Sequence, residues 1–260
     1  MQKRHTDREQ YFKELAATCK KYYIPFLDKE TSIGRGTKVL EIGCGDGGNL
    51  LPFLECGCDV TGIEISPTRI SQAKSFFEKH STAGRPELEC ADIFKWHTDK
   101  RFDIILLHDV IEHIHDKAAL LGKIEQLLTD DGLLFCGFPA WQMPFGGHQQ
   151  ICADKLLSHL PFIHLLPARL YRRFIKWRKE SDAKADELID IKDCRVTVES
   201  FEKIIKTQTR LTIRKRTLWL INPHYEIKFG LKPVRLACPF DRLAYIRNYM
   251  STSCFYLIGK

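Results

Sequence analysis

The sequence predicts an α/β fold with a doubly wound, mostly parallel sheet, and two observations lead to this prediction. Short apolar runs alternate with segments of helical periodicity through the first half of the chain. Parallel neighbours in a sheet need a long crossover, usually a helix, so the alternation indicates successive βαβ units. The chain has 260 residues, of which 44% are hydrophobic, and this suffices for one α/β domain with an insertion.

The alternating elements follow in a regular order between residues 38 and 138. Residues 102–108 are continuously apolar, as expected for a parallel strand that is buried on both faces. Ser66 and Pro67 suit the cap and the first turn of the helix that they begin. The predicted strands are 38–43, 59–64, 87–91, 102–108 and 132–138, and the predicted helices are 47–55, 67–80 and 116–128.

The regular alternation stops at Pro139. Residues from about 140 to 195 contain no clean strand, so we predict a helical insertion on the substrate side of the sheet. We divide the chain into a cap helix at 1–30 and a main domain at 31–260 that carries this insertion. Regular structure returns in three elements, a helix at 198–206, a β segment at 211–220 and a final strand at 253–258.

Composition excludes several classes of protein. No run approaches the roughly 18 consecutive apolar residues of a membrane span, and the charged segment 1–10 lacks the apolar core of a signal peptide. We therefore expect a cytoplasmic protein. The ten cysteines are scattered, and only Cys56 and Cys58 are close, which is not the paired spacing of a zinc site. Buried free thiols in a reducing compartment are the simpler interpretation.

The first predicted strand ends in a glycine-rich loop. Residues 39–50 read VLEIGCGDGGNL, so an apolar strand runs through Gly43, Cys44 and Gly45 directly into a helix. Glycines permit a tight turn and let the backbone approach a ligand closely. The spacing is G-x-G-x-G and not the G-x-G-x-x-G of a dinucleotide-binding fold. Taken alone, the loop would also fit a purely structural turn.

Acidic residues after the next strands make the loop more specific. Glu64 ends the second strand, about twenty residues beyond the loop, where a carboxylate can accept both hydroxyls of a ribose. Asp92 follows the third strand, where it can face an adenine amino group, cap a helix, or do both. Asp109 and Glu112 follow the fourth strand. Carboxyl ends of parallel strands meet at one edge, so we expect a nucleoside-binding crevice there.

With these motifs, residues 38 to about 139 resemble the class I S-adenosylmethionine-dependent methyltransferases. The matching segments are VLEIGCGDG, VTGIEIS, CADIF, FDIILLHDVIEHI and DGLLFCGFP. The resemblance implies a Rossmann-like, seven-stranded sheet with an antiparallel last strand, and S-adenosylmethionine as the cofactor. It also implies the cofactor-binding residues Glu41, Gly43, Cys44, Gly45, Glu64, Ile65, Asp92, Ile93 and His108.

An N-terminal helix is expected outside the sheet, because residues 8–27 carry apolar side chains at helical spacing. Pro25 should end this helix, since proline lacks the N–H that a helix interior needs. By position, Arg8, Tyr11 or Tyr22 is predicted to close over the methionine end of the cofactor. A helix that only packs against the domain is the competing interpretation.

The segment after the fourth strand limits the kind of methyl acceptor. The methyltransferases of nucleic-acid amino groups carry an Asn/Asp-Pro-Pro-aromatic motif there, whereas this chain reads HDVI at 108–111. We therefore expect no nucleic-acid partner. The segment DVIEHI is similar to a subgroup that includes quinone-ring O-methyltransferases, so a quinone or lipophilic phenol at a membrane is one alternative. A binding module without turnover is another.

The start of the insertion indicates the preferred acceptor. Its segment FPAWQMPFGGHQQ resembles methyltransferases of bacterial surface-glycan and natural-product clusters. The resemblance implies a small molecule, or a sugar or glycolipid hydroxyl, as the acceptor. Trp141 and Phe145 in this segment are predicted to stack on an acceptor ring.

A hydroxyl acceptor needs a base, and histidine titrates near neutrality. His148 follows two glycines in the predicted crevice and is one candidate, although a locally bonded loop histidine fits equally well. Asp109 with His113 is the other candidate pair. His113 with Asp109 and Glu112 could instead hold a metal, but a structural role for His113 is favoured and no metal is expected.

Much of the net charge of +7 lies within residues 169–179. Leu170, Phe174 and Trp177 share one helical face there, and the cations lie largely elsewhere. Such a segment is predicted either to contact an anionic membrane as a peripheral helix or to pack on its own domain. The oligomeric state is left open by the sequence.

Overall fold

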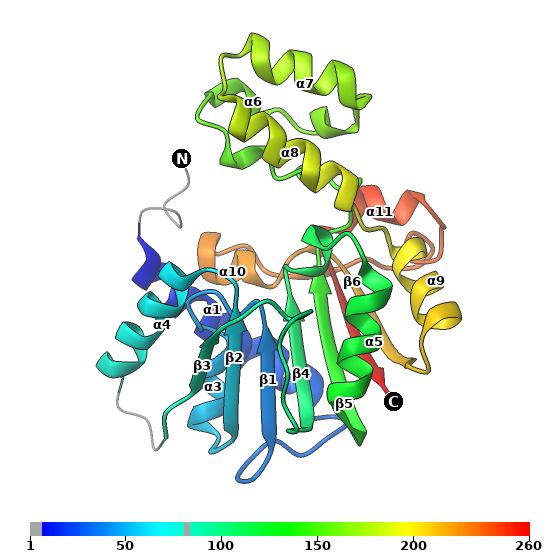
Figure 1. Cartoon of the computed structure of the whole chain (residues 1–260). Coiled ribbons are helices and arrows are strands. Elements are labelled where there is room, and N and C mark those ends of the chain that lie inside the picture. Colours follow the sequence, from blue (N-terminus) through cyan, green and yellow to red (C-terminus); the bar gives the residue numbers. More distant parts are fainter. Residues whose placement is uncertain (1–6, 81–83) are drawn as a thin grey trace.

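The computed structural model describes residues 7–80 and 84–260, so the first six residues of the predicted cap segment lie outside the described part. The chain forms one eight-stranded sheet with helices on both faces and a helical lobe above one edge (Figure 1). The strand order is β3-β2-β1-β4-β5-β8-β6-β7. The strands are β1 (Lys38–Ile42), β2 (Asp59–Glu64), β3 (Glu87–Cys90), β4 (Phe102–His108), β5 (Leu128–Phe138), β6 (Thr212–Ile221), β7 (Val234–Arg235) and β8 (Ser253–Gly259).

The strand directions confirm the predicted doubly wound, Rossmann-like fold. Strands β1 to β5 pair in parallel, and β8 pairs antiparallel with both β5 and β6. The predicted count of seven strands is wrong, because β7 pairs with β6 as an eighth strand. It has only two residues at the sheet edge, and so short a strand leaves no alternating pattern in a sequence.

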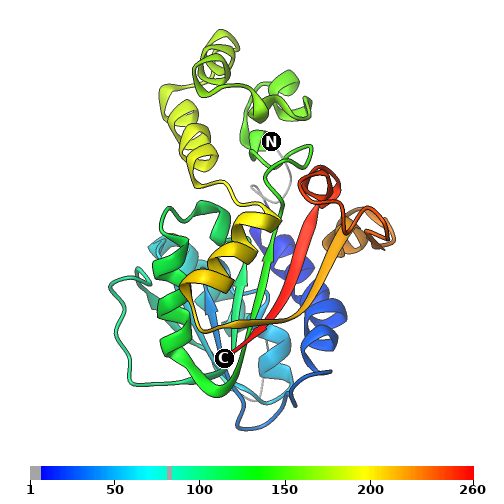
Figure 2. The same ribbon diagram turned by 90° about the vertical axis from the view of Figure 1, so that its right-hand side faces the viewer.

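Helices cover the two faces of the sheet in separate layers (Figure 2). One apolar cluster joins the sheet to α1, α3 and α4, and another joins it to α5 and α9. Within β4, Ile104 and Leu106 belong to the first cluster, whereas Ile105 and Leu107 belong to the second. This period of two is what a strand buried on both faces requires. The helices of these layers are α1 (Arg8–Thr18), α2 (Ile24–Leu27), α3 (Leu50–Glu55), α4 (Pro67–Lys79), α5 (Lys117–Leu127) and α9 (Val198–Gln208).

Pro25 does not end the N-terminal helix, contrary to the prediction. A single π-helical turn, Cys19–Tyr23, follows α1, and α2 continues with Pro25 in its first turn. Proline is tolerated there, because the first N–H groups of a helix have no intrahelical partner. Tyr23, the last residue of the wider turn, is fully buried.

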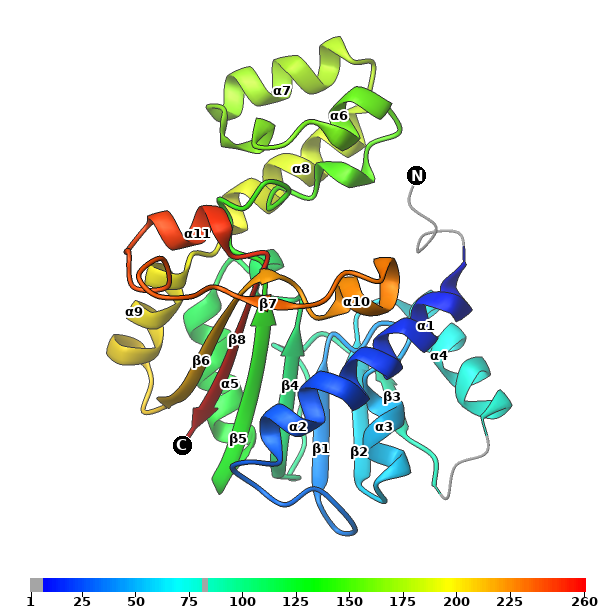
Figure 3. The ribbon, with the colours of Figure 1, turned by 180° about the vertical axis from the view of Figure 1, so that it is seen from behind.

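The predicted insertion forms a lobe of helices at the carboxyl ends of the parallel strands (Figure 3). Its helices are α6 (Lys155–His159), α7 (Ala168–Trp177) and α8 (Asp182–Cys194). The lobe has an apolar cluster of its own, which includes Leu157, Tyr171, Ile175 and Leu188. Two short helices, α10 (His224–Phe229) and α11 (Ile246–Met250), lie between β6 and β8 in the chain. Within the described ranges, no helix is both long and apolar enough to cross a bilayer.

Candidate active site

The turn after β1 is built on glycine. Gly43 and Gly45 have φ angles of +70° and +53°, a left-handed region that favours glycine. The N–H groups of Gly43 and Cys44 donate to the carbonyl oxygen of Ile63 at 2.8 and 3.0 Å. A Cβ on Gly43 would lie 2.5 Å from Cγ2 of Val110. The loop is therefore fixed between β2 and the segment after β4, and no larger residue fits at its first position.

The acidic residues at the strand ends are held in place by backbone donors. Oε2 of Glu64 accepts a hydrogen bond from the N–H of Gly45 at 3.1 Å, and Oε1 accepts one from the N–H of Ser66 at 2.9 Å. Each carboxylate oxygen keeps further acceptor capacity for a ligand. Oδ1 of Asp92 accepts from the N–H of Phe94 at 3.0 Å and so stabilises the turn after β3.

A cavity of about 440 Å³ lies at the carboxyl ends of β1 to β4 and is called the strand-end cavity below. Its size is typical of small-molecule sites. Its rim is apolar and open, since Ile65 is 70% exposed and Phe94 is 44% exposed. Five of the predicted cofactor-binding residues line it, namely Gly43, Glu64, Ile65, Asp92 and Ile93.

Three other predicted cofactor-binding residues are not among the lining residues of this cavity. Gly45 supports Glu64 through the bond described above. Glu41 is 2% exposed, and the side-chain N–H of Asn49 donates to its Oε1 at 2.7 Å. Burial raises the pKa of Glu41 to about 8, against the effect of the Asn49 bond. Cys44 is a buried free thiol whose pKa is raised by burial, so it is not poised as a nucleophile.

A second cavity, of about 120 Å³, is called the loop cavity below. It is lined by segments that are far apart in sequence, namely α1, the turn after β4, the start of the insertion, and α10. His108, a predicted cofactor-binding residue, lines this cavity and not the first. Other lining residues are Tyr11, Phe145, His148, Tyr225, Lys228 and Phe229.

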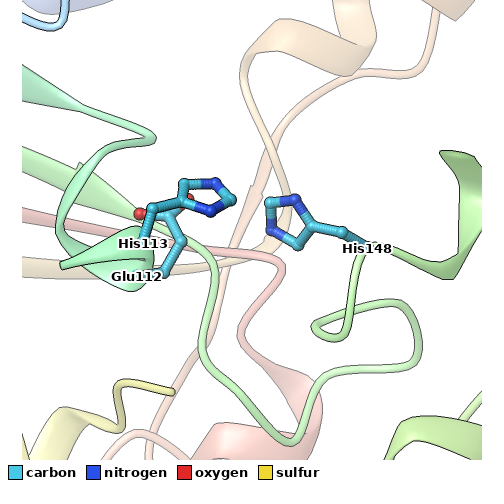
Figure 4. Close-up of side chains that lie close together, drawn as sticks. All are labelled: Glu112, His113 and His148. Atoms are coloured by element: carbon cyan, nitrogen blue, oxygen red, sulfur yellow. The ribbon is translucent and has the colours of Figure 1, made fainter. Parts of the chain in front are cut away.

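The two cavities meet at the turn after β4, because Asp109 lines both. Asp109 has a φ of +53°, an uncommon conformation for a residue other than glycine. His113 lines the strand-end cavity and His148 lines the loop cavity. Their rings face each other edge to face, with centroids 4.9 Å apart at 89° (Figure 4). The structure thus brings the three predicted catalytic residues to one junction.

The backbone before His148 presents its ring to this junction. A Cβ on Gly147 would lie 2.1 Å from Cβ of His164, so only glycine lets the loop pass there. His148 itself has a φ of +56°, and its N–H donates to the carbonyl oxygen of Phe145 at 3.0 Å. Desolvation by neighbouring atoms lowers the pKa of His113, although its side chain is exposed at the cavity rim.

The side chain of Glu112 lies beside His113 (Figure 4) and is 4% exposed. Neither of its carboxylate oxygens has a hydrogen-bond partner in the described part of the chain. Burial and, to a smaller extent, the nearby Asp109 raise the pKa of Glu112 well above its usual value.

Trp141 and Phe145, which were predicted to stack on an acceptor together, have different surroundings. Phe145 lines the loop cavity. Trp141 is 6% exposed, is not among the lining residues of either cavity, and packs edge-on against His164 at 4.7 Å. The Nε2–H of His164 donates to the carbonyl oxygen of Trp141 at 2.8 Å. Trp141 therefore supports the loop that carries Phe145, and its predicted contact with an acceptor has no support here.

The sequence did not identify α10 as part of the loop cavity. Its aromatic residues Tyr225 and Phe229 are four positions apart, which places them on one helical face and was an available signal. Tyr23 was also missed; its hydroxyl and Nε2 of His108 are 2.8 Å apart.

Of the three residues predicted to close over the cofactor, Tyr11 lines the loop cavity. Arg8 forms an ion pair with Asp46 and so joins α1 to the glycine loop. Tyr22 donates to the carboxylate of Glu226 in α10.

Solved structures with the same fold contain the cofactor or its demethylated product. The plantazolicin methyltransferase BpumL with S-adenosylhomocysteine matches with a TM-score of 0.53 and 17% identity, over 98% of this chain and 87% of that one. Magnesium protoporphyrin IX methyltransferase from Synechocystis PCC 6803 with bound S-adenosylmethionine matches with a TM-score of 0.52 and 13% identity, over 93% and 78%. At these identities the likeness shows the fold, which is that of S-adenosylmethionine-dependent methyltransferases.

The methyltransferase domain family matches residues 8–179, and the chain belongs to this family. A ubiquinone biosynthesis O-methyltransferase of Rhodopseudomonas palustris (strain BisB5) is 34% identical over 118 residues, 45% of each chain. The (S)-tetrahydroprotoberberine N-methyltransferase of Eschscholzia californica is 34% identical over 109 residues, 41% of this chain and 31% of its own length. The chain thus spans less than half the length of these curated relatives.

Proposed function

We propose that the protein transfers the methyl group of S-adenosylmethionine to a hydroxyl of a small-molecule acceptor. The observation that supports this most directly is the junction of the two cavities at Asp109, His113 and His148. The strand-end cavity would hold the nucleoside, and the loop cavity would hold the acceptor. The methyl group would then cross at the junction, where both candidate bases lie.

The reaction is an in-line displacement on an already activated sulfonium, so alignment and exclusion of water do most of the work. The acceptor oxygen forms a bond to the methyl carbon while the carbon–sulfur bond breaks and its electron pair stays on sulfur. The hydroxyl proton passes to an imidazole, for which His148 in the acceptor-side wall is the first candidate. Asp109 with His113 is the second, and the lowered pKa of His113 keeps its ring neutral and able to accept a proton.

The lining of the loop cavity favours an acceptor that carries a ring. Phe145, Tyr225 and Phe229 offer aromatic surface, and Lys228 offers a cation beside it. Aromatic surface beside a cation can bind sugars as well as phenols. A sugar or glycolipid hydroxyl therefore remains the preferred class of acceptor. The small volume of about 120 Å³ favours binding of one ring rather than a long chain within the cavity.

A quinone or lipophilic phenol at a membrane is the second candidate, and the outer face of α7 favours it. Leu170 and Trp177 are 53% and 65% exposed, whereas the packed face of this helix is made by Tyr171 and Ile175. Arg173 is also exposed, so apolar and basic groups share this face. The curated relatives named for ubiquinone biosynthesis agree in reaction class with this candidate.

The test is product analysis with S-adenosylmethionine labelled in the methyl group. The full chain is incubated with sugar, glycolipid and lipophilic phenol acceptors, and labelled product is measured with S-adenosylhomocysteine release. Labelled methyl ether on a hydroxyl acceptor is expected. Transfer only to nitrogen, sulfur or carbon would refute the proposal. Tight cofactor binding with no release over the whole panel and in a cell extract would favour a binding module without turnover.

A further inference from the structure

The carboxylate of Glu112 is the feature of the junction that the proposed reaction leaves unused. It is 4% exposed, and both of its oxygens lack a hydrogen-bond partner among residues 7–80 and 84–260. An ionised carboxylate in such surroundings is costly unless a cation or hydrogen-bond donors compensate it. Lys117 does so only in part, since its charge acts on Glu112 from nearby but its Nζ makes no hydrogen bond to that carboxylate and donates instead to the backbone carbonyl oxygens of Ile114, at 2.6 Å, and Cys194.

Two imidazoles converge on this carboxylate. One oxygen of Glu112, one ring nitrogen of His113 and one ring nitrogen of His148 all lie within 4.8 Å of one another. In Figure 4 the two rings point toward each other, with the carboxylate beside the ring of His113. His113 is exposed and His148 is partly exposed, so a small ion can reach the cluster from solvent.

We propose that Glu112, His113 and His148 bind a divalent first-row transition metal ion at the junction of the two cavities. Two imidazole nitrogens and one carboxylate oxygen are a donor set that Zn²⁺ and its neighbours favour, whereas Mg²⁺ prefers oxygen ligands alone. Donor atoms on one tetrahedral zinc ion lie about 3.4 Å apart, so the side chains must close by no more than about 1.4 Å. Three protein ligands leave at least one position open for water or for an acceptor oxygen.

Metal binding itself is independent of the acceptor, but its role in the reaction rests on the proposed function. With an ion in place, the two imidazoles hold the ion and do not act as bases. The ion lowers the pKa of the acceptor hydroxyl that it binds. The released proton passes to Asp109, which lines both cavities, and the oxygen then takes the methyl group from sulfur. The sequence favoured no metal, and this inference changes because the buried Glu112 carboxylate, without a hydrogen-bond partner among the described residues, lies beside two imidazoles.

The test is calorimetric titration of the chelator-treated full chain with Zn²⁺, followed by Co²⁺ with visible absorption as a readout of coordination. One equivalent of Zn²⁺ is expected to bind, and Mg²⁺ is expected not to compete. Glu112→Gln and His148→Ala should each weaken Zn²⁺ binding at least about 10-fold, since losing even an outer partner of a ligand costs that much. His159→Ala, which removes an exposed histidine outside both cavities, is the matched control and should leave binding unchanged.

A second group of possible ligands needs its own variant. His115, Asp190 and Cys194 also lie within reach of one ion, so His115→Ala should leave the Zn²⁺ stoichiometry and affinity unchanged. Loss of binding in His115→Ala, equal binding in Glu112→Gln, or no binding by the wild type would each overturn the site. Thermal melting of Glu112→Gln shows whether this variant still folds. If it does not, His148→Ala, which changes a loop residue, still tests the metal site.

A negative result for the metal site can be distinguished from a negative result for the proposed function. Zn²⁺ binding without methylation of any hydroxyl would refute the function and leave the metal site standing. Hydroxyl methylation by a chain that binds no metal would do the reverse.

Discussion

The two cavities of this protein are built in different ways. The strand-end cavity takes its walls from the ends of successive parallel strands, and its acids are held by backbone N–H groups such as those of Gly45 and Ser66. The loop cavity takes its walls from side chains of α1, the insertion and α10. Loops on a rigid scaffold accept substitutions that strand ends do not. Under the proposed function, backbone geometry therefore constrains the cofactor side, whereas the acceptor side can change with its loops.

His148→Ala is expected to have the largest effect and to fall on the acceptor side alone. Loss of a general base or of a metal ligand should lower kcat by about 100- to 10,000-fold. The affinity for S-adenosylhomocysteine should stay nearly unchanged, since His148 does not line the strand-end cavity. Steady-state kinetics and calorimetry measure the two effects, with His159→Ala as the control. An equal loss of cofactor affinity would contradict the separation of the two sides.

Gly43→Ala is expected to damage the cofactor side. The new Cβ would meet Val110 at 2.5 Å in a backbone with a φ of +70°, and such strain costs about 1–3 kcal/mol. S-adenosylhomocysteine affinity, measured by calorimetry, should fall by about 10- to 100-fold. Gly36→Ala is the matched control, because Gly36 has a φ of +86° but nothing within 4 Å of its Cβ position. If both variants lose affinity equally, general strain and not the close approach to Val110 is responsible.

Glu41 should make the stability of the protein depend on pH. Burial raises the pKa of Glu41 in the folded state to about 8 from its ordinary value of 4.5, so the folded state keeps a proton that the unfolded state has released. The free energy of unfolding should therefore fall as pH rises from about 4.5 to about 8. Urea unfolding at pH 5 and pH 8 measures this, and Glu41→Gln should show a smaller fall. A wild type that gains stability over this range would show that Asn49 outweighs burial.

The smallest effect on stability is expected at the outer face of α7. Leu170→Ser with Trp177→Ser should change the free energy of unfolding by no more than about 0.5 kcal/mol per site, because both side chains are exposed. The same pair should reduce sedimentation with anionic vesicles at low salt if the protein acts at a membrane. Ile175→Ala on the buried face is the contrast, with an expected cost of about 2–5 kcal/mol. No sedimentation of the wild type would remove the membrane candidate.

Local motifs explain why most of the fold and the strand-end cavity could be predicted. The strands before Gly43, Glu64 and Asp92 are continuous segments, and the topology of a parallel sheet brings their ends together. The loop cavity depends instead on contacts between distant segments, such as Tyr23 with His108 and α10 with α1. The spacing of residues along the sequence does not reveal contacts between segments that lie so far apart in the chain.

Helix α7 illustrates a second limit of prediction. Two apolar stripes run along it, one with Leu170, Phe174 and Trp177, the other with Tyr171 and Ile175. Helical periodicity identifies both, but only the packing of the lobe decides which stripe is buried. Likewise, the role of Pro25 depended on the π-helical turn before it, which has no distinct sequence pattern.

The π-helical turn also has a consequence for the N-terminal helix. It ends at Tyr23, whose ring packs against His108 at 5.0 Å, Phe135 at 4.9 Å and Phe255 at 5.3 Å between centroids. One phenol ring thus links the first helix to β4, β5 and β8 at once. Helix α1 is accordingly fixed in place as part of the wall of the loop cavity, which it lines with Tyr11, and Tyr23 joins it to His108 on the same cavity.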